Sequence, residues 1–359
     1  MSNKLKIGMI GCGGIALNKH LPYLSKINEV ELAAFSDTFA DKARQAAVQY
    51  GTADTAVYMD YKQLLANPGI DVVHVCTSND SHAEITIEAL EAGKHVMCEK
   101  PMAKLAADAV RMLETARRTG KKLTIGYNNR FRGDSQQLYK ICRNGDLGDI
   151  YYAKAHAVRR RGVPARGVFL DKEMQGGGPL IDIGTHALDL TLWMMDNYKP
   201  RMVVGSSYHK LSQIEETAIN GGWKPSDFTV EDSAFGMIVM ENGATVMLES
   251  SWALNIRHEG AAKVTLCGTK GGADMWDGLW INGEEHGKLY DKEIRMGLTG
   301  NPAVDNVRGK SIELEMRVWI DSILQDREPV VKPEQALAVS QILEALYESA
   351  YTGKAVYFV

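Results

Sequence analysis

An aspartate and a histidine stand four residues apart in a glycine-rich stretch near the middle of the 359-residue chain. The stretch reads Gln175-Gly-Gly-Gly-Pro-Leu-Ile-Asp182-Ile-Gly-Thr-His186-Ala-Leu-Asp189 and opens an apolar helix. Residues four apart share one helix face, and Asp189 extends the same side. A carboxylate that orients an imidazole raises its basicity, so His186 could accept a proton near neutral pH. The same pair could equally serve only as a helix cap and packing contact.

A second candidate is the glycine turn Gly11-Cys-Gly13-Gly14-Ile15-Ala16, which follows the apolar residues 7–10. We expect a buried strand, a tight turn and a helix start. Gly11 would permit the turn, Gly13 would let the backbone approach a pyrophosphate, and Ala16 would keep the helix close to the strand. The helix N-terminus would then face the phosphates. Glycine turns between strand and helix also arise for packing reasons, so this pattern alone leaves both possibilities open.

Asp37 ends a second strand-like run, residues 30–37, and lies 21 positions beyond Ala16. This is close to the roughly 20-residue spacing of a carboxylate that binds the adenosine ribose. An acid there accepts hydrogen bonds from the 2′-hydroxyl and would repel a 2′-phosphate, which favours NAD over NADP. Asp37 could instead cap a helix around residues 38–50. With both features in register, the sequence predicts dinucleotide binding.

The composition is that of an ordinary globular chain, with 45% hydrophobic and 24% charged residues, and the length predicts two domains. The net charge of −4 gives no electrostatic case for a nucleic-acid or anionic-membrane partner. The five cysteines are far apart and form no C-x-x-C, which suits a reducing cytosol and argues against disulfides and structural zinc. No metal is expected at Asp182 and His186 either, since no third His or Cys stands nearby. No apolar run approaches the length of a membrane span.

Strand and helix patterns alternate through the first half of the chain. Helices are expected at 41–50, 61–66, 83–92 and 105–118, and strands at 71–77, 95–98 and 122–125. Ser81, with Glu84 three positions on, predicts a capping box for the helix over 83–92. These repeats predict an α/β domain, a doubly wound parallel sheet with helices on both faces. Ligands bind beyond the carboxyl ends of such strands. The informative residues at those ends are Asp37, 77–79, 99–101 and 127–129.

From about residue 128 the pattern changes to longer strand-like runs with few helices. Strands are expected at 150–158, 202–209, 233–240, 244–252 and 263–267, with a helix at 135–142. This predicts an α+β domain with a largely antiparallel, open sheet. The tail is expected to hold a loop or lid over 283–309, then two helices. The first would begin at Ser311 and end before Pro329, and the second would begin at Pro333 and close at Gly353.

Four stretches together resemble the glucose–fructose oxidoreductase / inositol dehydrogenase family, often called Gfo/Idh/MocA. They are Gly11-x-Gly13-x-x-Ala16, Ser78-Asn-Asp-Ser-His82, Glu91-Ala-Gly-Lys-His-Val-Met-Cys-Glu99-Lys100-Pro101 and the glycine-rich run that ends at His186. The resemblance covers both halves of the chain, in the family's order. It departs at Ala16, which replaces the third glycine, and at Asn128-Asn129, in a segment that varies among substrate classes.

The resemblance implies an NAD(P)-dependent dehydrogenase acting on CH–OH donors, which transfers a hydride between NAD and a ring hydroxyl of a sugar, glycoside or cyclitol. It places Lys100 beside the nicotinamide and the substrate hydroxyl, where an ammonium would stabilise the developing alkoxide. Pro101 would shape the turn that aims Lys100, through a bond that can be cis. His186 would accept the proton, and Asp182 would hold His186 or a substrate hydroxyl. From the residues alone, Lys100 could be a surface lysine and Pro101 the first residue of a helix.

The expected cofactor and substrate sites follow from these patterns and the resemblance. The catalytic set is Lys100, Asp182 and His186. The cofactor-binding set is Gly11, Gly13, Gly14, Ile15, Ala16, Asp37, Thr38, Thr77, Ser78, Asn79, His82, Glu99, Lys100 and Asn128. The substrate-binding set is Lys100, Asn129, Arg130, Arg160, Arg166, Asp182 and His186.

We expect a Rossmann domain over 1–127 and a substrate-binding and oligomerisation domain over 128–359. The resemblance implies a cytoplasmic homodimer or homotetramer built through the C-terminal sheet. Two alternatives stay open at this point. One is a redox-neutral glycosidase or lyase of the same family that retains NAD, and the other is a non-catalytic regulator that senses a sugar or dinucleotide.

Overall fold

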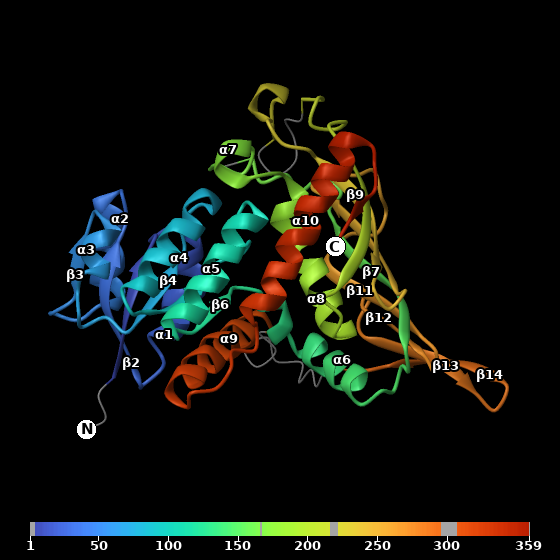
Figure 1. The fold of residues 1–359 in the computed structure, drawn as a ribbon, viewed down its shortest axis with the longest axis horizontal. Coiled ribbons are helices and arrows are strands. Elements are labelled where there is room, and N and C mark those ends of the chain that lie inside the picture. Colours follow the sequence, from blue (N-terminus) through green and yellow to red (C-terminus); the bar gives the residue numbers. More distant parts are fainter. Residues whose placement is uncertain (1–3, 166, 216–221, 296–306, 359) are drawn as a thin grey trace. The chain divides into compact units, whose positions relative to one another are not determined.

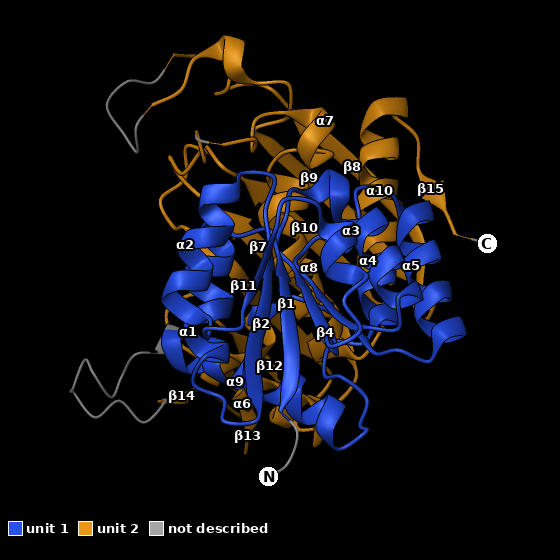
Figure 2. Cartoon of the chain, turned by 90° about the vertical axis from the view of Figure 1, so that its left-hand side faces the viewer, with its two compact units in different colours: residues 1–128, 308–337 blue, residues 129–307, 338–359 orange. Residues whose placement is uncertain are grey.

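The computed structural model describes residues 4–165, 167–215, 222–295 and 307–358. Its contacts divide the chain into two compact units, which are coloured separately in Figure 2. Unit 1 comprises Met1–Asn128 and Arg308–Leu337, and unit 2 comprises Asn129–Val307 and Ala338–Val359. The predicted division into residues 1–127 and 128–359 does not include Arg308–Leu337 in the first unit.

The sheet of unit 1 has the parallel strand order β3-β2-β1-β4-β5-β6. This is the order of the doubly wound dinucleotide-binding fold, so the predicted fold class is confirmed. The order reverses between β1 and β4, and ligands of such sheets bind at that point, beyond the carboxyl ends of the strands. The strands are β1 (Leu5–Ile10), β2 (Val30–Ser36), β3 (Ala56–Tyr58), β4 (Val72–Val75), β5 (His95–Cys98) and β6 (Leu123–Ile125).

Helices cover both faces of this sheet, as Figure 2 shows with α1 and α2 on one side and α3, α4 and α5 on the other. The helices are η1 (Ala16–His20), α1 (Leu21–Leu24), α2 (Ala40–Tyr50), α3 (Tyr61–Leu65), η2 (Asn79–Ser81), α4 (His82–Glu91), α5 (Ala106–Thr119) and α9 (Val307–Leu324), and the start of α10 (Pro333–Thr352). The capping box predicted at Ser81 is wrong. Ser81 ends the 3₁₀ turn η2 with helical dihedrals, and its hydroxyl bonds Thr77 and Ser78 instead.

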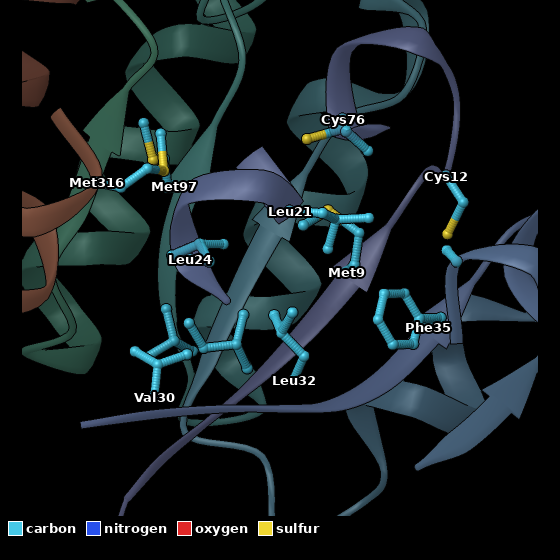
Figure 3. Packing of buried hydrophobic residues seen from close by; sticks show 14 of the residues in the cluster. Met9, Cys12, Leu21, Leu24, Val30, Leu32, Phe35, Cys76, Met97 and Met316 are labelled. Carbon is cyan, nitrogen blue, oxygen red and sulfur yellow. The ribbon is translucent and has the colours of Figure 1, made fainter. Parts of the chain in front are cut away.

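Helix α9 completes the hydrophobic core of unit 1. Met316, Trp319 and Ile320 are at most 3% exposed and belong to the same buried cluster as residues of β1 and β2. Figure 3 shows the Met316 side chain beside Met97 of β5. The helix begins at Val307, before the predicted start at Ser311, and Ser311 is a buried residue within it.

This packing predicts that Ile320→Ala destabilises the protein by about 2–5 kcal/mol, because it leaves a cavity in a core that includes β1 and β2. Leu314→Ala on the same helix is the control, since Leu314 is 40% exposed. It should change stability by less than about 0.5 kcal/mol. Urea unfolding followed by circular dichroism measures both. Equal effects of the two substitutions would show that α9 is not part of this core.

The sheet of unit 2 is open and largely antiparallel, as predicted, with the order β14-β13-β12-β11-β7-β10-β9-β8-β15. Among its strands in the described part of the chain, only β7 and β10 pair in parallel. The strands are β7 (Ile150–Val158), β8 (Pro200–Tyr208), β9 (Ser233–Met240), β10 (Thr245–Ser251), β11 (Gly260–Gly268), β12 (Gly272–Asp274), β13 (Trp280–Glu285), β14 (Lys288–Glu293) and β15 (Val356–Tyr357).

Helices of unit 2 pack on one face of this sheet, where α8 contacts β7 and β11 (Figure 1). They are η3 (Asn128–Phe131, whose first residue belongs to unit 1), α6 (Gly133–Arg143), α7 (Lys172–Gln175), η4 (Leu180–Gly184), α8 (Thr185–Met195), η5 (Pro225–Asp227) and the rest of α10. Across the described ranges, no helix is both long and apolar enough to cross a membrane.

The loop or lid predicted over 283–309 is wrong for its first part. Residues 283–293 lie in the hairpin β13–β14, whose turn residues His286 and Gly287 have φ of 53° and 78°. Two successive positive φ values are typical of the tight turn that matches strand twist. All of β14 is exposed, so it lacks the alternating apolar pattern by which a strand is recognised. Residues 296–306 of the predicted loop lie outside the described residues, and 307–309 begin α9.

Candidate active site

The glycine turn after β1 is shaped as a dinucleotide cradle requires. Gly11 has φ of 85°, and a Cβ there would lie 2.6 Å from the Cys76 carbonyl oxygen, so only glycine fits between β1 and β4. At Gly13 an added Cβ would meet no described atom within 4 Å. In the helix that follows, the Leu17 N–H donates a hydrogen bond to the Gly13 carbonyl at 3.1 Å. The N–H groups before Leu17 therefore lie in the first turn, where intrahelical acceptors are lacking and an anion can bind.

Asp37 braces this turn. Its Oδ2 accepts from Cys12 N–H at 2.8 Å, and its Oδ1 accepts from Phe39 N–H at 2.8 Å, next to the exposed Thr38. One carboxylate thus links the glycine turn to the residues just before α2, although it does not cap that helix, whose N-cap position is Phe39. Each carboxylate oxygen can accept more than one hydrogen bond, so the predicted ribose contact is compatible with both. That contact stays a prediction.

The Lys100–Pro101 peptide after β5 is cis, and the His82 ring contacts Pro101. His82 is 1% exposed, with Nδ1 2.8 Å from the Pro101 carbonyl oxygen and Nε2 3.3 Å from that of Thr77. Burial lowers the pKa of His82, so the neutral ring has one N–H to donate, and both neighbours are carbonyl acceptors. The shorter contact, to Pro101, lets this buried ring support the Lys100 turn. The predicted cofactor residues Thr77, Ser78, Asn79, Lys100 and Asn128 are partly exposed.

The Glu99 carboxylate points into the protein rather than toward a ligand. Its Oε1 accepts from Lys19 Nζ at 2.7 Å and lies 2.8 Å from His20 Nε2. Burial alone would raise its pKa, but the Lys19 charge and the His20 bond hold the pKa of Glu99 well below its ordinary value. The sequence-based assignment of Glu99 to the cofactor site therefore needs correction, since only its backbone is left for that contact.

Lys19 also pairs with Glu315 of α9, at 3.2 Å from Nζ to Oε2. Burial raises the pKa of Glu315 from 4.5 to about 7, although the Lys19 charge opposes the shift. A raised pKa means that folded protein binds this proton more tightly than unfolded protein. The resulting contribution to stability is fully present below pH 4.5 and is lost as pH rises through about 7.

Glu315→Gln should therefore gain stability relative to the wild type as pH rises. Because glutamine cannot lose this proton, the difference in unfolding free energy should move by on the order of 3 kcal/mol between about pH 5 and pH 8. Thermal unfolding across this range measures it. Glu313→Gln, an exposed position on the same helix, is the control. A pH-independent difference for Glu315→Gln would mean that Glu315 titrates normally.

In unit 2, Asp182 lies in the π-helical turn η4 and His186 in the first turn of α8, both partly exposed. Trp252 Nε1 donates to Asp182 Oδ2 at 3.0 Å. Ser250 Oγ donates to the Pro179 carbonyl at 2.7 Å, and a Cβ at Gly184 would lie 2.9 Å from that Oγ. The start of the helix therefore packs closely against the sheet at Gly184. Single π-helical turns such as η4 are frequent at functional sites.

Two expectations about charged residues need correction. Arg130 is fully buried, and its Nε and Nη2 donate to Asp189 at 2.9 and 2.5 Å, so the guanidinium is used inside the protein and not on a substrate. Asp189 is 1% exposed and does not extend an open Asp182–His186 face. Burial raises the pKa of Asp189 while Arg130 opposes the shift. Of the other predicted substrate residues, Asn129 is partly exposed, Arg160 is exposed, and Arg166 lies outside the described residues.

Glu231 and Tyr347 form a hydrogen-bonded clamp on the glycine-rich run that the sequence does not predict. Glu231 accepts from Gly178 N–H at 2.9 Å, from Leu180 N–H at 3.2 Å and from the Tyr347 hydroxyl at 2.8 Å. A Cβ at Gly177 would lie 2.1 Å from that hydroxyl, and one at Gly178 would lie 2.1 Å from the Glu231 carbonyl oxygen. The glycines are thus required by this packing. Nothing in the local sequence marks Glu231 or Tyr347, because both are distant in the chain.

Glu231→Gln should lower both stability and turnover, because one amide oxygen cannot replace a carboxylate that accepts three hydrogen bonds. A buried backbone N–H would face the amide NH₂, at a cost of about 1–3 kcal/mol. The affinity for NAD should hardly change, since the clamp lies in unit 2. Thermal unfolding, turnover and NAD titration measure the three effects. Glu241→Gln, at an exposed turn, is the control, and an unchanged melting temperature for Glu231→Gln would argue against the clamp.

An open glycine turn on a doubly wound sheet, with an acid at the end of the second strand, defines a dinucleotide-binding enzyme domain. Residues 5–127 match the model of the oxidoreductase family with an NAD-binding Rossmann fold, and residues 135–274 match the GFO/IDH/MocA C-terminal domain. The chain therefore belongs to the Gfo/Idh/MocA family of oxidoreductases, which confirms the resemblance and NAD as the cofactor. It is an NAD-dependent dehydrogenase that acts on CH–OH groups.

The chain is similar to several proteins of known name. It is 39% identical to D-glucoside 3-dehydrogenase of Escherichia coli over 354 residues, 98% of this chain and 97% of that one. It is 32% identical to myo-inositol 2-dehydrogenase of Thermotoga maritima over 191 residues, 53% of this chain and 55% of that one. Levoglucosan dehydrogenase, solved with NADH and levoglucosan, has the same fold, with a TM-score of 0.85, 21% identity and 99% of both chains covered.

Proposed function

We propose that this enzyme oxidises the hydroxyl at carbon 3 of a D-glucoside or a closely related sugar, with NAD as the hydride acceptor. The similarity to D-glucoside 3-dehydrogenase along almost the whole chain carries this choice of substrate. The reaction breaks the C–H bond of the carbinol carbon, and the hydride passes to NAD. The hydroxyl proton leaves as the C=O bond forms, so a base and an electrophilic partner for the oxygen are both needed.

The chain offers one group for each of these tasks. Lys100, on the turn after β5, would stabilise the negative charge that develops on the substrate oxygen. His186 would take the hydroxyl proton. Asp182, held by Trp252, would orient His186 or bind a neighbouring hydroxyl. NAD itself supplies the hydride-accepting carbon, and the glycine turn with Asp37 would hold its pyrophosphate and ribose.

Three further assignments belong to the same proposal. Asn129, Arg160 and Arg166 are candidates for binding substrate hydroxyls. The enzyme would assemble as a homodimer or homotetramer through the sheet of unit 2, on which Phe235, Met237 and Met247 are partly exposed. It would work in the cytoplasm, a reducing compartment that suits its five free thiols.

Purified protein with NAD should oxidise D-glucosides and release NADH, measured by nicotinamide absorbance. Lys100→Met and His186→Ala should each lower turnover by at least about a hundredfold, because each removes a group that acts in the transition state. NAD affinity should stay nearly unchanged. Lys26→Met and His209→Ala, both exposed positions, are the matched controls.

Product analysis then decides between the candidate reactions. NADH formed in proportion to a 3-keto sugar supports the proposal. Conversion of a glycoside without free NADH would favour the redox-neutral enzyme, and NAD binding without any conversion would favour a sensor. Wild-type turnover that survives both Lys100→Met and His186→Ala would overturn the assigned roles.

A further inference from the structure

Five ionisable side chains form a connected group in the interior of unit 1. Lys19 and His20 come from η1, His74 from β4, Glu99 from the residue after β5, and Glu315 from α9. None is more than 6% exposed. Lys19 lies 2.7 Å from Glu99 and 3.2 Å from Glu315, His20 Nε2 lies 2.8 Å from Glu99, and His20 Nδ1 lies 2.8 Å from His74 Nδ1.

This group is attached to the turn that carries Lys100. Glu99 Oε2 accepts from the Lys100 backbone N–H at 3.3 Å, while Oε1 is held by Lys19 and His20. Gly126, at the end of β6, closes the other side of the carboxylate. A Cβ at Gly126 would lie 2.9 Å from Oε1 and 3.0 Å from Oε2 of Glu99. The carboxylate thus joins η1 and the ends of β5 and β6.

The hydrogen-bond directions in this group follow from its chemistry. Burial lowers the pKa of His20 and of His74, so both rings are neutral near pH 7 and each carries one ring N–H. An ionised carboxylate can only accept, so His20 donates from Nε2 to Glu99. Its Nδ1 must then accept from His74 Nδ1. His74 therefore fixes the tautomer in which His20 holds Glu99.

Stability alone is a weak reason for such a group. Buried ion pairs cost desolvation energy, and apolar replacements of similar volume are often as stable or more so. Placement of a reacting group within a fraction of an ångström, in contrast, has a large effect on rate. Because Glu99 bonds the Lys100 backbone N–H, this group of side chains can help to place Lys100.

We propose that His20 and Lys19 are positioning residues for Lys100, acting through the Glu99 carboxylate without contacting substrate or NAD. The inference rests on the proposed role of Lys100 in turnover. Lys19 and His20 fix the carboxylate, and the carboxylate fixes the backbone from which the Lys100 side chain extends. His74 sets the tautomer of His20, and Glu315 shares the Lys19 charge.

The test compares His20→Leu with His20→Gln. Glutamine can still donate from its amide nitrogen to Glu99, whereas leucine fills the space without a donor. His20→Leu should lower kcat for the glucoside by about ten- to a hundredfold with little change in KM for NAD. His20→Gln should recover most of that loss. A purely structural role predicts that kcat follows the melting temperature in both variants instead.

A second measurement reads Lys100 directly and needs no turnover. Lysines are methylated reductively with ¹³C-formaldehyde, and the Lys100 signal is assigned with Lys100→Arg. In His20→Leu the chemical shift of this signal should change, because the backbone at Lys100 is no longer held, whereas in His20→Gln it should match the wild type. An unchanged Lys100 signal in a folded His20→Leu protein would overturn the proposal. Because this signal is read without substrate, it separates a failure of this inference from a failure of the proposed function.

If His20→Leu does not fold, Gly126→Ala provides the same test by displacing the Glu99 carboxylate with a single methyl group. It should move the Lys100 signal and lower kcat. Gly69→Ala is its control, since its Cβ would approach only the Asn67 side-chain oxygen, at 3.2 Å. A Lys100 signal that stays at its wild-type position in Gly126→Ala would count against the proposal.

Discussion

A buried carboxylate that accepts backbone N–H groups sets the position of each candidate catalytic segment. In unit 1, Glu99 holds the N–H of Lys100. In unit 2, Glu231 holds the N–H groups of Gly178 and Leu180, at the start of the helix that carries Asp182 and His186. Such acceptors are costly to bury unless every lone pair finds a donor. Lys19 and His20 supply donors to the first carboxylate and Tyr347 to the second, so each segment depends on residues from other parts of the chain.

The sequence predicted the elements well wherever burial imposes a period on the chain. Strands β5, β7 and β9 have the predicted bounds, because their alternating or continuous apolar residues record what they face. The exposed hairpin β13–β14 has no such apolar pattern, so its sequence predicts a loop. The helix α9 was predicted, but its partner was not. A periodic apolar stripe shows that a helix is buried without showing against which sheet, and here the stripe packs in the core of unit 1.

The same limit applies to the site. The motifs nominate Lys100, Asp182, His186 and the glycine turn as candidates, since each belongs to a local sequence pattern. They could not separate a charged residue that is free for a ligand from one that is paired inside the protein. Arg130 and Glu99 stand in or beside motifs, yet their partners Asp189, Lys19 and His20 lie 59 to 80 positions away in the chain. Pairing over such separations becomes visible only in the folded structure.

The glycine-rich run shows that the glycines of a motif can be required by packing inside the protein. Gly177 and Gly178 face Tyr347 and Glu231 at distances that no side chain could tolerate, and Gly184 faces Ser250 in the same way. These glycines let the helix start approach the sheet, where Trp252 can reach Asp182. Part of the signature is therefore a packing requirement, and the proposed chemistry would fall to Asp182 and His186, which are partly exposed. The two glycines of the turn in unit 1 differ in the same way. Gly11 is required because the backbone at Cys76 lies too close for a side chain, whereas no described atom lies close to the position of a Cβ at Gly13.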